Sequence, residues 1–219
     1  MLVVGLTGTI GSGKTEVARI ARGEGIPVVS SDDVARRIME TDPDVRAALH
    51  QRFGSDVVPD TGPLDRRRLA ELIFGPTTDH TEHRHFVEQL VHPRVIESIA
   101  QWLDQLAARG EPMAIVESAL IYNAGIEDLF DYVVAVVAPE SLRRQRYRER
   151  TGSDADFEPR QQAQLSDDEL RQRADFTIVN DGTLDDLEQA TKTLLAILRH
   201  LPPRPVESVE DTDDEQADR

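Results

Sequence analysis

The sequence predicts an α/β fold in which helices cover both faces of a five-stranded parallel sheet. Five short apolar runs alternate with segments of helical periodicity, and they cover residues 2–7, 26–30, 113–117, 132–137 and 176–179. Strands that are buried on both faces read as continuous apolar runs rather than as alternating ones. The first run leads into a glycine-rich turn and then a helix, which is the order of a doubly wound sheet.

Helical periodicity is clearest in two further parts of the chain. Between the second and third runs, apolar residues recur at three- to five-residue spacing, at Phe86, Leu90, Val95, Ile99, Trp102 and Leu106. We expect a helical insertion at about 60–110 that builds a substrate cap, with Pro93 starting or kinking a helix. Residues 184–198 predict a last amphipathic helix. One domain is therefore predicted over 1–201, followed by an acidic, disordered tail at 202–219.

Composition restricts the class of protein. The 219 residues are 39% hydrophobic and include no cysteine, which suits one core and excludes thiolate zinc sites and cysteine nucleophiles. No run approaches the roughly 18 apolar residues that cross a bilayer, so we expect a cytoplasmic protein without a secretory signal. The net charge of −16 argues against nucleic-acid and anionic-membrane partners. Composition leaves the oligomeric state open between a monomer and a small homo-oligomer.

Arginine supplies nearly all of the positive charge, because Lys14 and Lys192 are the only lysines. The arginines concentrate at 66–68 and again at 143–150. Guanidinium groups bind phosphate bidentately, so such clusters suit an anionic substrate. The alternative, which we expect for most of them, is pairing with Asp and Glu on solvated helix faces.

The motif with the most chemical content is the turn at 8–15, which reads Gly-Thr-Ile-Gly-Ser-Gly-Lys-Thr. It fits the P-loop pattern G-x-x-x-x-G-K-[ST] between a predicted strand and a predicted helix. We expect Lys14 to neutralise the β- and γ-phosphates of ATP and the Thr15 hydroxyl to bind Mg²⁺. The residues expected to bind ATP are Gly8, Gly11, Ser12, Gly13, Lys14, Thr15 and Glu16. The glycine spacing argues against a dinucleotide-binding turn, because it does not have the G-x-G-x-x-G pattern.

A P-loop alone does not separate kinases from GTPases and motor ATPases. The sequence has no N-K-x-D motif for guanine, and the apolar run 113–117 ends in a single acid, Glu117. A lone Asp32 after the second run and an arginine-rich helix late in the chain fit a small-molecule kinase. The P-loop NTPase fold with a kinase activity is therefore the prediction.

Short motifs along positions 2–200 resemble dephospho-CoA kinase. The motifs lie at residues 5–8 and 10–14, at Asp32 and residues 35–36, and at residues 64–66, 69 and 73–74. Further motifs lie at residues 90 and 92–93, at 117–122, at 160–164, and at 174–175, 178 and 180. The resemblance implies that ATP phosphorylates the ribose 3′-hydroxyl of dephospho-CoA, the last step of coenzyme A synthesis. It also implies a core, a CoA-side helical region at about 60–110 and a mobile lid at about 143–173.

Three residues are assigned to the acceptor side by this resemblance. Asp32 matches the acid that accepts the proton of the substrate hydroxyl, although an acid there also suits a helix N-terminus. Arg66 matches a substrate contact, whereas Arg67 and Arg68 are expected to be surface residues. His92 either orients the substrate or holds a helix end.

The lid residues follow from the same resemblance. Arg146 or Arg150 is expected to stabilise the transferring phosphoryl group, and a shift of two residues would assign the role to Arg144 or Arg148. We take Arg146 as the catalytic candidate.

Further lid and nucleotide positions complete the assignment. Arg160 and Gln164 match other lid positions, and Asn180 is expected to border the adenine pocket, unless it forms an ordinary turn. Two rival functions stay open: a kinase for another small acceptor, and a nucleotide-switch binding protein.

Overall fold

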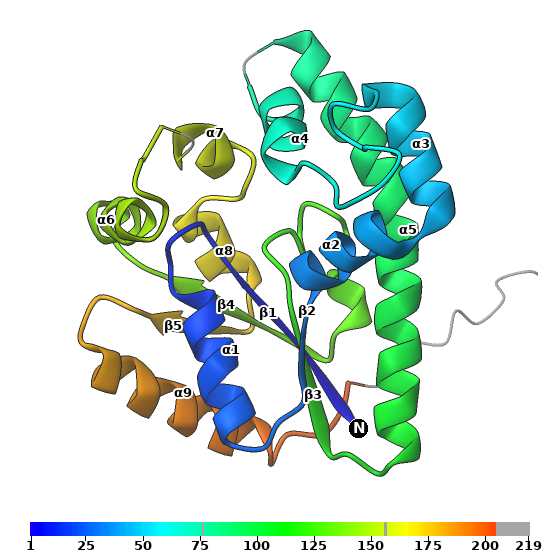
Figure 1. Ribbon diagram of the computed structural model, residues 1–219. Coiled ribbons are helices and arrows are strands. Elements are labelled where there is room, and N and C mark those ends of the chain that lie inside the picture. Colours follow the sequence, from blue (N-terminus) through cyan, green and yellow to red (C-terminus); the bar gives the residue numbers. More distant parts are fainter. Residues whose placement is uncertain (76, 156, 205–219) are drawn as a thin grey trace, which may run out of the picture.

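The computed structural model describes residues 1–75, 77–155 and 157–204. Its centre is a parallel sheet of five strands in the order β2-β3-β1-β4-β5 (Figure 1). The strands are β1 (Leu2–Gly8), β2 (Val28–Ser30), β3 (Met113–Glu117), β4 (Tyr132–Val137) and β5 (Phe176–Val179). The predicted five-stranded parallel sheet is confirmed. Only the second strand is shorter than expected, because it begins at Val28. The preceding Pro27 has no N–H to donate, and its carbonyl accepts a hydrogen bond from Ile115 N–H.

Nine α-helices and one short 3₁₀ helix lie in the described part of the chain. They are α1 (Lys14–Gly23), α2 (Ser31–Thr41), α3 (Pro43–Phe53), α4 (Arg66–Ile73), α5 (Thr78–Ala108), η1 (Glu127–Leu129), α6 (Glu140–Thr151), α7 (Phe157–Gln162), α8 (Asp167–Arg173) and α9 (Leu184–Leu198). The helix predicted at 184–198 has these bounds. The long α5 passes through Pro93 instead of beginning there.

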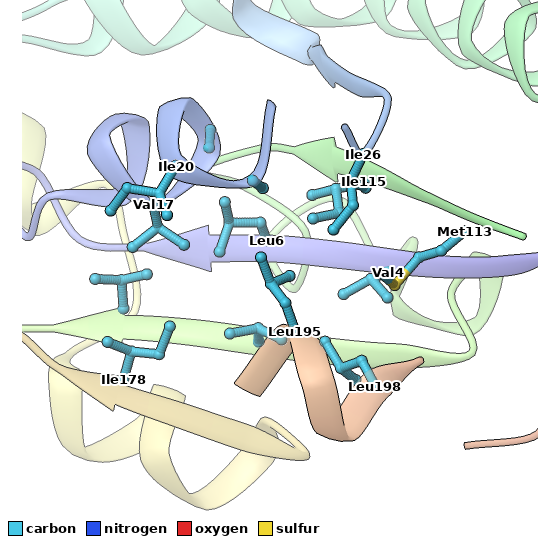
Figure 2. Packing of buried hydrophobic residues seen from close by; sticks show 14 of the residues in the cluster. Val4, Leu6, Val17, Ile20, Ile26, Met113, Ile115, Ile178, Leu195 and Leu198 are labelled. Atoms are coloured by element: carbon cyan, nitrogen blue, oxygen red, sulfur yellow. The ribbon is translucent and has the colours of Figure 1, made fainter. Parts of the chain in front are cut away.

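Two apolar clusters hold helices on opposite faces of the sheet. On one face, α1 and α9 pack on β1, β3, β4 and β5 through residues such as Leu6, Ile20 and Leu195 (Figure 2). On the other face, Trp102 of α5 and Leu170 of α8 pack against the sheet. The result is the predicted αβα arrangement of three layers, in which β3 is buried along its whole length.

A third apolar cluster lies outside these layers. It joins α2, α3, α4 and α5 as far as Ile99 around fully buried residues such as Val45 and Leu49. Figure 1 shows this helical region beyond the ends of the strands, with α6 and α7 across from it. The region contains much of the predicted insertion at about 60–110, and the proposed division of the chain into insertion and lid stays a prediction.

Two sequence predictions concern the chain ends and the membrane. Of the tail predicted at 202–219, residues 205–219 lie outside the described residues. None of the helices described here has the length and apolar character that crossing a membrane requires.

Candidate functional site

The P-loop joins the carboxyl end of β1 to the start of α1. Gly11 and Gly13 have φ angles of +77° and +98°, in the left-handed region that favours glycine. A Cβ atom at Gly11 would lie 2.4 Å from the carbonyl oxygen of Arg143, and one at Gly13 would lie 2.2 Å from Asn180 Nδ2. Both glycines are therefore required by the backbone conformation and by the neighbours. Since α1 begins at Lys14, its first amides are available to an anion at the loop.

A buried carboxylate at the end of β3 lies against the P-loop. Glu117 is 6% exposed, and its Oε1 accepts a hydrogen bond of 2.9 Å from the Thr15 hydroxyl. The same oxygen is 3.9 Å from Lys14 Nζ, so the buried negative charge has a cationic partner. The register of the sheet explains the position, because Glu117 pairs with Leu6 of β1 on one side and with Ser30 of β2 on the other. Sequence reasoning noted Glu117 as the acid that ends the strand but did not assign it to the site.

Asp32 lies in the first turn of α2, directly after β2. The N-cap of α2 is Ser30, and no side-chain hydrogen bond caps this helix. The exposed Asp32 thus does not act as a helix cap and instead lines a cavity together with the P-loop. Its neighbour Asp33 is held by Arg36, with 2.7 Å between Oδ1 and Nη1. The structure therefore separates the two adjacent acids: one faces the cavity and the other forms a surface ion pair.

The cavity has a volume of about 610 Å³ and lies where the strands of the core, the helical region and α6 and α7 face one another. P-loop residues 9–14 form one wall, and the segment 119–124 after β3 contributes another part. Ligands of open parallel sheets bind at the carboxyl ends of the strands, which is where this cavity is. Its charged lining consists of the cations Lys14, Arg84, Arg146, Arg150 and Arg160 and the carboxylates Asp32 and Glu88. Such an excess of cations suits phosphorylated ligands.

The structure distinguishes the two sets of lid arginines. Arg146 and Arg150 line the cavity, and Arg146 donates to the carbonyl and side-chain oxygens of Asn180 at 3.2 and 3.3 Å. Arg144 instead pairs with Glu140 and Glu158. Arg148 donates to Asp154 at 2.8 Å, and this hydrogen bond holds the pKa of Asp154 below its ordinary value. Arg146 and Arg150 therefore line the same cavity as the P-loop, whereas Arg144 and Arg148 are held in ion pairs, and the catalytic role of Arg146 stays a prediction.

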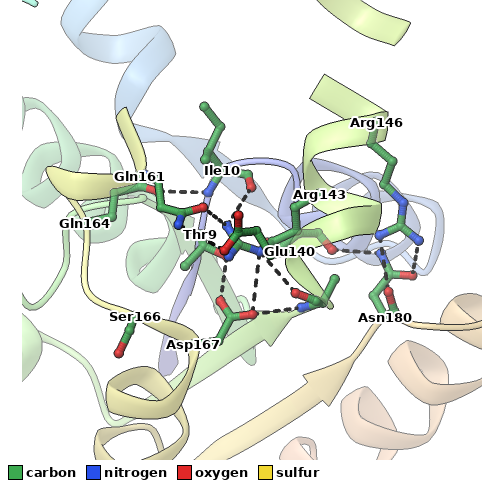
Figure 3. Close-up of polar contacts among 12 residues, drawn as sticks. Thr9, Ile10, Glu140, Arg143, Arg146, Gln161, Gln164, Ser166, Asp167 and Asn180 are labelled. Atoms are coloured by element: carbon green, nitrogen blue, oxygen red, sulfur yellow. Dashed lines mark hydrogen bonds and ion pairs between the residues drawn. The ribbon is translucent and has the colours of Figure 1, made fainter. Parts of the chain in front are cut away.

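Polar contacts fix the P-loop to the segment that follows β4 (Figure 3). The N–H of Ile10 donates to Gln164 Oε1 at 2.8 Å, and its carbonyl accepts from Arg143 at 3.4 Å. The Thr9 hydroxyl donates to Asp167 at 2.7 Å, while Arg143 and Asp167 form an ion pair at 3.6 Å. Arg143 and Asp167 were not identified from the sequence, because no local motif marks contacts across more than a hundred residues.

Two further predicted residues are Asn180, which packs against the P-loop, and His92, which lines the cavity. The side chain of Asn180 is buried and donates to the carbonyl oxygen of Ser12 at 2.8 Å. It supports the P-loop from behind and does not belong to the residues that line the cavity. His92 lines the cavity beside Glu88, on the helical side.

Two predicted binding residues lie away from the cavity lining. Arg66 is exposed and pairs with Glu40. Glu16 forms an ion pair with Arg19, one turn along α1. The cavity lining brings together Gly11, Ser12, Gly13, Lys14, Asp32, His92 and Arg146 of the predicted residues, whereas Gly8, Thr15 and Asn180, like these two, are outside it.

A P-loop at the end of a parallel sheet, with an acid and several arginines around one cavity, defines the class of P-loop kinases. A family model described as dephospho-CoA kinase matches residues 2–186. The chain belongs to the dephospho-CoA kinase family. The resemblance seen in the sequence motifs is thereby confirmed.

Individual relatives agree with the family. The dephospho-CoA kinase of Anaeromyxobacter dehalogenans is 37% identical over 200 residues, which cover 91% of this chain and 93% of the relative. That of Salinibacter ruber is 37% identical over 195 residues, covering 89% and 96%. Among solved structures, TT1252 from Thermus thermophilus has a TM-score of 0.74 at 35% identity and covers 90% of this chain and 97% of its own. These matches span nearly the whole described fold.

Proposed function

We propose that this kinase transfers the γ-phosphate of ATP to the ribose 3′-hydroxyl of dephospho-CoA, giving coenzyme A. Its family defines the reaction as ATP-dependent phosphorylation of dephospho-CoA. The observation that carries the proposal for the site is that Asp32 and the P-loop line one cavity. An acid that faces the phosphate-binding loop can receive a proton where a hydroxyl meets the transferred phosphoryl group.

The P-loop would hold the donor nucleotide. The amides of the first turn of α1 and the ammonium group of Lys14 offer positive charge to the β- and γ-phosphates of ATP. Because Lys14 is only 13% exposed in its side chain, its charge acts from a position largely shielded from water. Arg146 and Arg150 line the same cavity from α6 and would stabilise the negative charge of the phosphoryl group during transfer.

The hydroxyl oxygen of Thr15 and the carboxylate of Glu117 are a pair of metal-ligand groups that fits Mg²⁺. A hydroxyl and a carboxylate are ligands that this hard cation prefers, and they lie 2.9 Å apart beside Lys14. When bound there with ATP, Mg²⁺ would neutralise charge on the phosphates and help to align them. In the protein without ligand, the Thr15 hydroxyl and Lys14 compensate the buried carboxylate.

The acceptor hydroxyl would lie between Asp32 and the γ-phosphate. Its oxygen forms the new bond to phosphorus, the bond from the γ-phosphate to ADP breaks, and the hydroxyl proton passes to the Asp32 carboxylate. His92 lines the same cavity beside Glu88 and would orient the substrate from the helical region. Approach of α6 and α7 over the substrates would exclude water, which would otherwise compete as the acceptor.

The direct test uses the full-length protein with ATP, Mg²⁺ and dephospho-CoA, and measures ADP and coenzyme A together. We expect both products in equal amounts, with ADP formation dependent on the acceptor. Acceptor-independent ATP hydrolysis would favour a nucleotide switch instead. Phosphorylation of a different alcohol in place of dephospho-CoA would favour a kinase for another small acceptor.

The role of Asp32 is tested by Asp32→Asn, with Asp33→Asn as the matched control. Loss of the proton acceptor should lower kcat by about 10²- to 10⁴-fold while the affinity for ATP changes little. Asp33→Asn removes the same charge one residue away, from a surface ion pair, and should leave kcat nearly unchanged. Equal effects of the two substitutions would remove Asp32 from this role. The cytoplasmic location and the oligomeric state stay predictions.

A further inference from the structure

An arginine of α7 reaches across the cavity to the helical region. The guanidinium carbon of Arg160 lies 4.7 Å from the centre of the Phe74 ring, at the end of α4. Both residues line the cavity that contains the P-loop. Stacking on an aromatic ring holds the plane of a guanidinium group and leaves its N–H donors at the edge. The contact therefore orients Arg160 instead of neutralising it.

Part of this guanidinium group has no polar partner. Within the described residues, Arg160 Nε is buried and makes no hydrogen bond. Buried polar groups in folded proteins nearly always have a partner, so an orphaned donor in a residue that lines a cavity suggests a missing acceptor atom. Since the group is cationic, an anionic oxygen suits it best.

A second cation lines the same cavity from the helical region. Arg84 projects from α5, and its Nε is 3.9 Å from Glu88, so this ion pair is loose. The remaining cations of the lining, Lys14, Arg146 and Arg150, belong to the P-loop and to α6, where the donor ATP is expected. Arg84 and Arg160 are thus the two cations of the lining to which the proposed ATP site assigns no role.

We propose that Arg160, held by Phe74 and assisted by Arg84, binds the diphosphate group of the acceptor. The inference rests on the proposed function, because it concerns the acceptor of that reaction. Dephospho-CoA carries its diphosphate on the same ribose as the reacting 3′-hydroxyl. With that hydroxyl beside Asp32, the diphosphate lies one sugar ring away in the same cavity. The fork of a guanidinium group matches the oxygens of a phosphate.

This arrangement would make Arg160 a specificity-determining residue. An acceptor that lacks the diphosphate would leave Arg160 Nε without a partner and would bind poorly. The alternative is a purely mechanical role, in which Arg160 and Phe74 only fasten α7 to the helical region. The two roles differ in which substrate they affect: a mechanical contact acts on the whole cavity, whereas diphosphate binding acts on the acceptor alone.

The test compares Arg160→Gln and Arg160→Lys with the wild type and with Arg171→Gln. Arg171 is an exposed arginine of α8 and serves as the matched control. We measure KM for each substrate, the Kd of dephospho-CoA by calorimetry without ATP, and Tm. Arg160→Gln should raise KM and Kd for dephospho-CoA by about tenfold or more, with KM for ATP and Tm nearly unchanged. Arg160→Lys should recover part of this loss, because it restores the charge without the fork.

The outcomes distinguish the inference from the function on which it rests. If the wild type neither binds dephospho-CoA nor forms coenzyme A, the proposed function fails. If the wild type does both and Arg160→Gln binds dephospho-CoA as tightly, the diphosphate site is overturned alone. Equal increases in KM for both substrates, or a lowered Tm shared by the Gln and Lys variants, would show the mechanical role instead.

Discussion

Replacing Arg143 by methionine tests whether the buried polar contacts behind the P-loop stabilise the fold. Arg143 is 5% exposed, although it carries a full charge. It donates to the carbonyl of Ala138 at 3.1 Å, to the side chain of Gln161 at 3.1 Å and to the carbonyl of Ile10 at 3.4 Å. It also pairs with Asp167 at 3.6 Å. Methionine keeps much of the volume but removes all four interactions.

The magnitude follows from what the substitution leaves behind. Removing one partner of a buried ion pair costs about 3–5 kcal/mol. The lower end applies here, because Asp167 is 21% exposed in its side chain and keeps hydrogen bonds from Thr9 and from the amide of Ala138. About 3 kcal/mol in a chain of this length corresponds to a decrease in Tm of about 6–12 °C.

Thermal unfolding followed by calorimetry measures this effect. Arg144→Met is the matched control, since Arg144 is the next residue of α6 and forms its ion pairs at the surface. We expect a much smaller change in Tm for the control, because solvent screens exposed pairs. Equal changes for the two variants, or an unchanged Tm for Arg143→Met, would refute the reasoning that these buried contacts stabilise the fold.

Two further predictions concern the P-loop and a helix cap. Gly13→Ala should abolish ATP binding in a nucleotide titration, whereas Gly25→Ala, with φ of +78° and no atom within 4 Å of the added methyl, should lower only Tm. ATP binding by Gly13→Ala would contradict this. The Thr183 hydroxyl and amide hold the pKa of Asp186 below its ordinary value, so its contribution to stability is complete above about pH 5 and is lost as pH falls through the folded-state pKa. Asp186→Asn should therefore flatten the acid limb of a Tm-against-pH profile, and a parallel profile would exclude this cap as a source of the pH dependence.

The sheet was predictable because its strands leave strong local signals. Residues 132–137 and 113–117 are almost continuously apolar, as strands covered on both faces must be. The second strand was predicted two residues too long, since Ile26 is buried in the core but is not part of the ladder. A buried residue just before a strand is as apolar as a residue within it. The sequence therefore does not show where the pairing of β2 with β3 begins.

The predicted parts of the site are those that a short motif encodes. The positive φ angles of Gly11 and Gly13 and the adjacent Lys14 follow from the spacing of the P-loop. The partners of the loop could not be found in this way. Glu117 reaches Thr15 through strand register, and Gln164 reaches Ile10 through the packing of the segment after α7. Such contacts depend on tertiary structure, which local pattern does not contain.

The close approach of Asn180 to Gly13 means that these two positions share a single volume. A larger side chain at 180 would press on the loop from behind, just as a methyl group at 13 would press on Asn180. A smaller one would leave the carbonyl of Ser12 without its donor. Neither residue can be exchanged alone at low cost, so the loop that faces the nucleotide and the end of β5 are expected to change together or not at all.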